Sequence, residues 1–143
     1  MKKADIGYLV LRLALGAVFV MHGLNKIWPA KFPGPSTGIP DFATALAGMG
    51  VPIPDIMAYV VAATELGGGA LVILGLFPQI AALGLLGVMV VAIAKVHFKN
   101  GFFLPGGYEF ATILGGAALT IVIGGAGEFS LGSMMKSRGK KKG

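Results

Sequence analysis

Residues 56–76 read IMAYVVAATELGGGALVILGL, and this stretch decides the fold because Glu65 is its one charged side chain. A helix of about 20 apolar residues spans the hydrocarbon core of a bilayer. A charged residue at the centre of such a helix costs about 2.5–3.5 kcal/mol on insertion scales. We therefore predict a membrane-spanning helix in which Glu65 faces other parts of the protein and has a partner there.

The composition of the whole chain indicates a lipid environment. The chain has 143 residues, of which 55% are hydrophobic and 13% are charged, and its mean hydropathy is +0.82. Soluble domains carry about 25% charged residues. Too little polar surface therefore remains to cover a water-soluble globule. The length fits a single domain, residues 1–143.

Basic residues are concentrated at the C-terminus. The formal net charge is +6, and five of the 12 lysines and arginines lie within residues 136–143. A basic segment beside a membrane span marks the cytoplasmic side and contacts anionic lipid headgroups, so we predict both for the tail, residues 132–143. This placement argues against nucleic acid as a partner. Lys2 and Lys3 precede an apolar run too long for a cleavable signal peptide, so we expect that run to remain as a helix.

Hydropathy predicts four membrane-spanning helices and one shorter helix between the first two. The spans cover about residues 6–27, 56–76, 80–97 and 109–126. Four antiparallel spans place both termini on one side, which the basic residues mark as cytoplasmic. We therefore predict an all-α fold, an antiparallel four-helix bundle that crosses a membrane several times.

The shorter helix, about residues 41–49, begins at Asp41 as an N-cap and stops at Gly50. Its apolar residues lie on one face, so it either lies on the membrane surface or is an ordinary helix within a surface loop.

The polar residues of the first span share one face. Arg12, His22 and Lys26 fall within a sector of roughly 80° on a helical wheel. Counted from the outer boundary by helical rise, His22 lies ~8 Å deep, Glu65 ~14 Å and Arg12 ~22 Å. The long side chain of Arg12 reaches toward Glu65 from below. We therefore predict a buried Arg12–Glu65 ion pair, with His22 as the alternative partner of Glu65.

Further polar residues complete an expected intramembrane cluster, in which Lys26, Lys95, His97 and Glu109 lie near the outer boundary. Its members are Arg12, His22, Lys26, Glu65, Lys95, His97 and Glu109. The ion pair of Glu65 either fixes the register of the helices or places a proton acceptor beside a quinol, with His22 as its exchange partner. Glu109 either caps the fourth span or forms a salt bridge to Lys26 or Lys95.

The sequence argues against bound metal groups. If the chain bound a haem through histidines, His22 and His97 would be the axial ligands. Their predicted depths differ, however, and lysines surround them. No metal site is predicted, because a tetrahedral site needs three or four ligands. The absence of cysteine also excludes disulfides and cysteine-ligated iron–sulfur clusters.

Small residues at two places predict close helix packing. In membrane helices, small residues let neighbouring backbones approach. The predicted packing positions are Gly67, Gly68 and Gly69 after Glu65, and the stripe Thr112, Gly116, Thr120 and Gly124 in the fourth span.

Several short motifs together resemble the DoxX family of small membrane proteins. They are Arg12 followed by G-x-x-F, His22-Gly23-x-x-Lys26, E-x-x-G-G from Glu65 to Gly69, L-x-x-L-G ending at Gly75, F-x-x-x-G-G-x-E ending at Glu109, and G-x-G-x-F-S from Gly125 to Ser130. The resemblance extends from about Leu9 to Leu131. It departs from the family pattern at Gly132, where DoxX-like sequences often carry an acidic residue after F-S-L.

The resemblance implies a four-helix inner-membrane protein linked to redox chemistry. It implies an accessory or structural subunit of a membrane-bound oxidoreductase, more a non-catalytic subunit than an enzyme on its own. Such a subunit would help form a quinone or quinol pocket through Arg12, His22 and Glu65, within a larger redox complex or a homo-oligomer. Two alternatives stay open: a small-solute or proton-coupled membrane carrier, and an assembly factor without catalytic activity.

Overall fold

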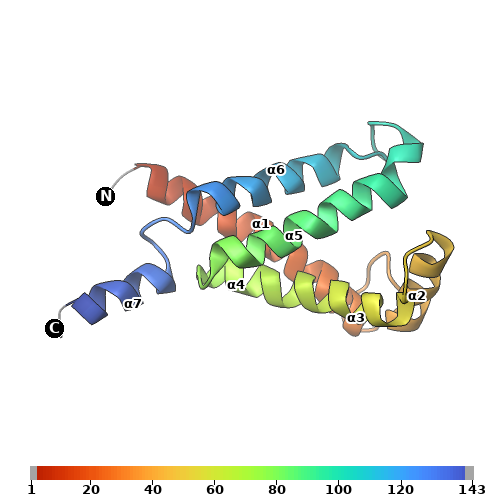
Figure 1. Ribbon diagram of the computed structural model, residues 1–143, viewed down its shortest axis with the longest axis horizontal. Coiled ribbons are helices and arrows are strands. Elements are labelled where there is room, and N and C mark those ends of the chain that lie inside the picture. The colour runs from red at the N-terminus through yellow and green to blue at the C-terminus, as the bar shows by residue number, and fades with distance from the viewer. Residues whose placement is uncertain (1–2, 141–143) are drawn as a thin grey trace.

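The computed structural model describes residues 3–140, and this range consists of helices and loops without any strand (Figure 1). The helices are α1 (Lys3–Ile27), α2 (Ile39–Gly48), α3 (Pro54–Ala63), η1 (Thr64–Gly68), α4 (Gly69–Leu74), α5 (Pro78–Ala92), η2 (Ile93–His97), η3 (Phe98–Asn100), α6 (Glu109–Gly124) and α7 (Leu131–Lys140). The prediction of an all-α fold is confirmed. Lys2, Lys141 and Lys142, which were assigned to the basic ends, lie outside the described residues.

Several of these elements join into longer helices. Pro54–Leu74 runs without a break through α3, η1 and α4, and Pro78–Asn100 runs through α5, η2 and η3. Together with α1, these are three helices long and apolar enough to cross a membrane. The fourth predicted span, α6, is apolar but has only 16 residues.

Proline and glycine set the ends of the long helices. Pro54 and Pro78 occupy the first turns of α3 and α5, where a missing backbone N–H leaves no hydrogen bond unmade. Gly75 ends α4 with φ 67°, a left-handed conformation that glycine adopts without steric cost. These residues place a tight turn between α4 and α5.

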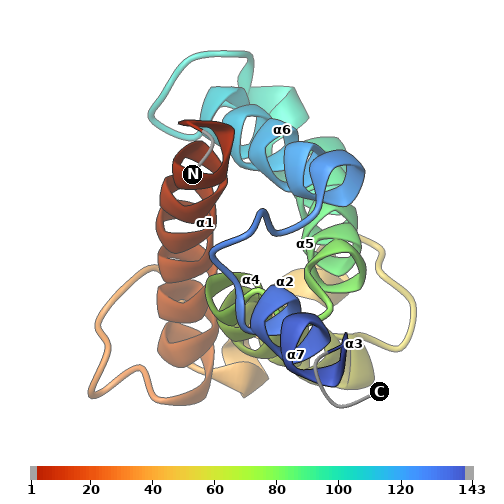
Figure 2. The same ribbon diagram turned by 90° about the vertical axis from the view of Figure 1, so that its left-hand side faces the viewer.

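The long helices pack around one apolar core. Helix α1 contacts η1 and α4 on one side and α6 on another, while α5 lies along α6 (Figures 1 and 2). Leu15, Phe19, Val72, Leu85 and Ile121 are each at most 2% exposed at the centre. Helix α2 packs on α3 at the end of the molecule opposite the two termini (Figure 1).

Close glycine contacts set the register between α1 and the helix that carries Glu65. Gly23 lies against the backbone of Leu66, and a Cβ on Gly69 would lie 2.9 Å from the carbonyl oxygen of Gly16. Glu65 is therefore level with the last turn of α1, and α3 extends beyond that turn to meet α2. The depths predicted from the sequence assume that both helices start at the same boundary, and they therefore place Glu65 about two turns too far from Lys26 along the axis.

The predicted packing positions divide into two groups. Gly68 and Gly69 lie at helix contacts, whereas Gly67 has no neighbour within 4 Å of a built Cβ.

The prediction that the stripe on α6 packs against another helix is wrong, because Thr112, Gly116 and Thr120 are exposed. Each threonine hydroxyl donates to the carbonyl four residues earlier. Helix α6 packs through Ala111, Leu114, Ala118 and Ile121 instead. Gly124, the last residue of the stripe, lies against Tyr8 of α1.

Most of the predicted basic tail is helical, since residues 131–140 form α7. Ser130 is the residue before this helix, and its Oγ accepts a hydrogen bond from the Ser133 N–H at 3.2 Å. A serine in this position satisfies a free N–H of the first turn and favours helix initiation. Figure 1 shows α7 extending away from the bundle at the end of the molecule where α1 begins.

Candidate functional site

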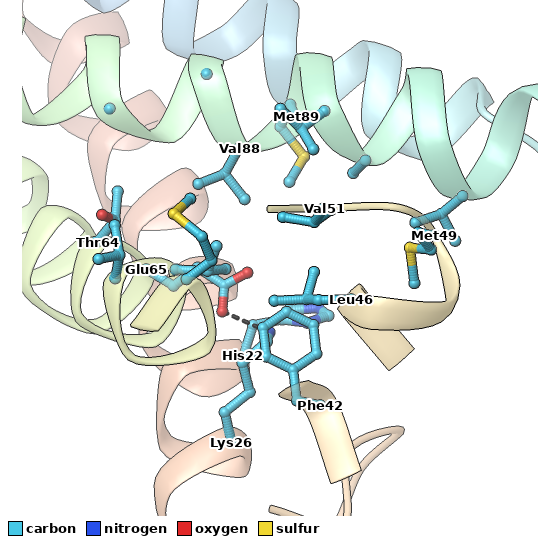
Figure 3. Close-up of a pocket in the computed structure, with 18 of the residues that line it drawn as sticks. His22, Lys26, Phe42, Leu46, Met49, Val51, Thr64, Glu65, Val88 and Met89 are labelled. Atoms are coloured by element: carbon cyan, nitrogen blue, oxygen red, sulfur yellow. Dashed lines mark hydrogen bonds and ion pairs between the residues drawn. The ribbon is translucent and has the colours of Figure 1, made fainter. Parts of the chain in front are cut away.

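A cavity of about 390 Å³ lies between α2, α3, η1 and α5 (Figure 3). Most of its wall is aliphatic or methionine side chain. The lining residues are His22, Lys26, Phe42, Leu46, Met49, Val51, Met57, Val60, Val61, Thr64, Glu65, Gly84, Gly87, Val88, Met89, Val91, Ala92, Val96 and His97. We call this space the outer cavity. An apolar wall with a few polar groups gathered at one end is typical of a small-molecule site.

The outer cavity exists because α3 and α5 diverge. Helix α5 packs against η1 and α4 but has few contacts with α3 within residues 3–140. The loop after α2, with Met49 and Val51, lines the resulting gap. Val60 and Val91 line the cavity and are also 46% and 49% exposed on the outside of the bundle. The cavity therefore opens sideways between α3 and α5, on the surface that lipid would cover.

The polar end of the outer cavity is built on a buried ion pair. Lys26 Nζ lies 2.6 Å from Glu65 Oε2, and the two residues are only 7% and 4% exposed. The ring of Phe42, from α2, lies 4.9 Å from Lys26 Nζ and adds a cation–π contact. Lys26 also stands in the last turn of α1, where a positive charge is favourable. The pair has no net charge, which makes a carboxylate at this depth tolerable.

Two π-helical turns place polar side chains at the same cavity. Glu65 lies in η1 and His97 lies in η2, both of which are π-helical. Such turns are rare inside α-helices and occur often at functional sites. Each wider turn changes the direction of the side chains that follow, and here both occur at the level of the ion pair.

Both histidines line the outer cavity together with Glu65. His22 precedes Lys26 by one helical turn on α1, and its ring makes no hydrogen bond to the described residues. His97 Nδ1 lies 2.8 Å from the carbonyl oxygen of Gly106 in the loop before α6. Figure 3 shows His22 beside the Glu65 carboxylate.

A second cavity, of about 130 Å³, lies between α1, α5, α6 and the loop before α6. We call it the inner cavity. It shares five lining residues with the outer cavity, namely His22, Glu65, Met89, Ala92 and His97. The carboxylate and both histidines therefore stand at the junction of two spaces.

The predicted Arg12–Glu65 pair is wrong. Arg12 is 2% exposed and donates to the carbonyl oxygens of Val72 and Ile73 at the end of α4. It also donates to the carbonyls of Ala126 and Phe129 in the loop after α6, so the four contacts span 2.5 to 2.9 Å. Glu65 faces the other direction along the bundle. The correct partner, Lys26, is brought to it by the register between the helices.

Gly132, where the family pattern often has an acidic residue, lies close to Arg12 and the carbonyls that it contacts. A Cβ built on Gly132 would lie 2.9 Å from the carbonyl oxygen of Gly75. A Cβ built on Gly75 would in turn lie 3.0 Å from Arg12 Cζ. This packing favours glycine at both positions. The charge of Arg12 is balanced by backbone carbonyls instead of a carboxylate.

Two other members of the expected cluster lie outside the cavities. Lys95 is exposed, and Glu109 accepts a hydrogen bond at 2.7 Å from the Leu104 N–H. Within the described residues Glu109 forms no salt bridge to Lys26 or Lys95, so it caps the loop at the start of α6. In the same range, no group of three or more His, Asp or Glu side chains is placed to hold a metal ion.

Sequence reasoning missed the part that α2 plays. Its apolar face was predicted, but not that Phe42, Leu46 and Met49 would cover the ion pair and line a cavity. A buried Lys26 needs an element that covers it, and this need could have predicted the helix. Lys26 was expected at the membrane boundary instead, where no cover is required.

Comparisons with known proteins agree with the motifs. The family model described as DoxX matches residues 7–98. A Bacillus subtilis (strain 168) protein named "Putative oxidoreductase CatD" is 33% identical over 142 residues, which cover 99% of this chain and 96% of that protein. No solved structure matches the chain.

Proposed function

The chain belongs to the DoxX family, and we propose that it is a non-catalytic subunit of a membrane-bound oxidoreductase that holds a quinone or quinol in its outer cavity. The family membership and the name of the Bacillus subtilis relative support the link to redox chemistry. The observation that carries the proposal is the combination of an apolar cavity, open toward lipid, with a buried Lys26–Glu65 pair at its closed end.

The shape and chemistry of the outer cavity match an amphiphile with an aromatic headgroup and an apolar tail. The volume of about 390 Å³ falls within the range of about 300–1,000 Å³ seen for small-molecule sites. The tail would leave between α3 and α5, past Val60 and Val91, into the surrounding lipid. The headgroup would then lie beside Met89 and Phe42, with its oxygens toward the ion pair.

Each polar residue has a role in holding such a headgroup. Lys26 donates to an oxygen of the headgroup with the protons that Glu65 leaves free, and the carboxylate of Glu65 accepts from a quinol hydroxyl. His22 lines the same cavity as Glu65 (Figure 3) and would exchange a proton with that carboxylate. The Lys26–Glu65 bond also holds both side chains in place before the ligand arrives.

We propose that the four apolar helices form an antiparallel bundle in the inner membrane, with both termini in the cytoplasm. Helix α6, at about 24 Å, is shorter than a hydrocarbon core of about 30 Å. The apolar loop beside it, with Phe102 and Phe103, extends the apolar surface at that end. The basic tail would contact anionic lipid headgroups on the cytoplasmic side.

Quinone binding is tested with the purified protein in nanodiscs, using decylubiquinone as the probe. We expect saturable binding that falls at least tenfold in Lys26→Gln and in Glu65→Gln. Lys95→Gln and Glu109→Gln make the same chemical changes outside the cavity and are expected to leave the affinity unchanged. Equal affinity in all four variants would exclude the outer cavity as the binding site.

The role as a subunit needs a separate measurement. Purification in a mild detergent should retain a redox partner in a fixed ratio to this chain. Recovery of a homo-oligomer alone, with no bound quinone, would contradict the proposal and favour a carrier or an assembly factor.

A further inference from the structure

Glu65 lines the inner cavity as well as the outer cavity, and ligand binding in the outer cavity gives no role to the inner one. We propose that the inner cavity is a water-filled vestibule that connects Glu65 and His22 with the aqueous phase at the end of the bundle that carries the 101–108 loop. The proposal deepens the proposed function, because a proton accepted by Glu65 from a quinol needs a route to water. The vestibule itself does not depend on which ligand occupies the outer cavity.

Three polar side chains with unused hydrogen-bonding capacity meet at the vestibule. Glu65 Oε1 and the ring nitrogens of His22 make no hydrogen bond to residues 3–140, and His97 has committed only its Nδ1. None of these atoms is sealed from solvent, because among the described side chains the one sealed, unpaired polar atom is Asp5 Oδ2. They are therefore reachable by water from a cavity.

The size of the vestibule fits a short chain of waters. A volume of about 130 Å³ holds about four molecules at the ~30 Å³ that each occupies in liquid water. A buried water needs two to four polar partners, and an apolar cavity without them stays dry. Glu65, His22 and His97 supply such partners at one end of this cavity.

The loop before α6 supplies the outlet. Gly106 and Gly107 line the vestibule beside His97, and the carbonyl of Gly106 also accepts from Asn100 Nδ2 at 3.1 Å. These polar groups continue from the cavity to the exposed face of the loop. Side chains of Leu104 and Phe110 form its apolar rim.

The opposite end of the vestibule is closed. Leu85, Ala118 and Ile121 fill the bundle toward the termini and are each 0% exposed. The vestibule therefore opens to water at one end of the bundle only, as expected for proton exchange with one aqueous phase and not for a channel through the protein.

The absence of native cysteine allows a direct test of water access. Ala111→Cys and Leu114→Cys place a thiol on the wall of the vestibule, and Ala118→Cys places one on the same helix in the dry core. The probe is a charged, membrane-impermeant methanethiosulfonate reagent applied to protein in nanodiscs. We expect the two vestibule thiols to react at least tenfold faster than the thiol at position 118.

Folding and ligand binding are measured on the same samples. Ala111→Cys is a small change that should leave elution and thermal unfolding unaltered, so it remains informative if Leu114→Cys does not fold. Equal, slow reaction at positions 111 and 118 would overturn the vestibule. Fast labelling at position 111 without any quinone binding would keep the vestibule and contradict the proposed function instead.

Discussion

Helix α1 buries two cations, Arg12 and Lys26, and the molecule uses them in different ways. Arg12 lies toward the termini and donates hydrogen bonds to four backbone carbonyls of α4 and of the loop after α6. Lys26 lies toward the opposite end and has one carboxylate and one aromatic ring as partners. Both residues are at most 7% exposed.

The difference separates a structural site from a candidate functional site. The partners of Arg12 are fixed parts of the backbone, and Arg12 lines neither the outer nor the inner cavity. Lys26 and its partner Glu65 line a cavity and retain donors and acceptors that a ligand can use. A buried cation is therefore informative about function only when its partners and its surroundings are known.

The largest expected effect comes from Arg12→Met, which keeps the length of the side chain and removes every donor. Each hydrogen bond to a charged group contributes about 1.5–3 kcal/mol, and the carbonyls left behind are partly buried. We expect the free energy of unfolding, measured by SDS titration in dodecylmaltoside, to fall by about 3–5 kcal/mol.

Arg12→Lys is the matched control, because it keeps the charge but cannot reach four carbonyls with one ammonium group. It should recover less than half of the loss. Quinone affinity of the folded fraction should stay unchanged in both variants. A loss of affinity as large as that in Lys26→Gln would end the distinction between the two cations.

The next effect concerns the pairing of Glu65. In a double-mutant cycle, Lys26→Gln and Glu65→Gln should show a coupling energy of about 2 kcal/mol, because either change alone leaves a buried charge without its partner. Arg12→Gln and Glu65→Gln should be additive within about 0.5 kcal/mol, since the two residues share no contact. Both cycles are measured by the same unfolding titration. The opposite pattern would restore the Arg12–Glu65 pair.

Much of the fold could be predicted from hydropathy, because a membrane span needs a long apolar run and each run is separated by proline or glycine. Glu65 could likewise be predicted to need a protein partner. The partner itself could not, because it depends on how far α3 extends beyond α1. Gly16, Gly23 and Gly69 set that register through backbone contact, and a sequence does not show which glycine faces which helix.

The cavities were beyond prediction for a related reason. They arise where α3 and α5 diverge and where two π-helical turns displace Glu65 and His97, and neither feature has a sequence pattern. The stripe of Thr112, Gly116 and Thr120 shows the converse error. Small residues at helical spacing predicted a packed face, but α6 packs through a different face and leaves this one exposed.

A smaller effect is expected at the mouth of the outer cavity. Gly87 lines the cavity on α5, and a Cβ there would meet no atom within 4 Å. Gly87→Leu should fill the opening without disturbing the helix and weaken decylubiquinone binding about tenfold, or about 1.4 kcal/mol. Gly116→Leu is the matched control, because Gly116 also has open space but lies on the outer face of α6. Equal affinity in both variants would place the ligand elsewhere.

The smallest expected effect tests the contact between α2 and the ion pair. Phe42→Leu keeps an apolar side chain over Lys26 but removes the ring, so it should cost about 0.5–1 kcal/mol of unfolding free energy. Phe42→Tyr keeps the ring and should cost less. In a Lys26→Gln background the loss from Phe42→Leu should disappear, since no cation remains to face the ring. The same loss in both backgrounds would show that Phe42 acts only through packing. Helix α2 would then cover the cavity without a favourable cation–π interaction with Lys26.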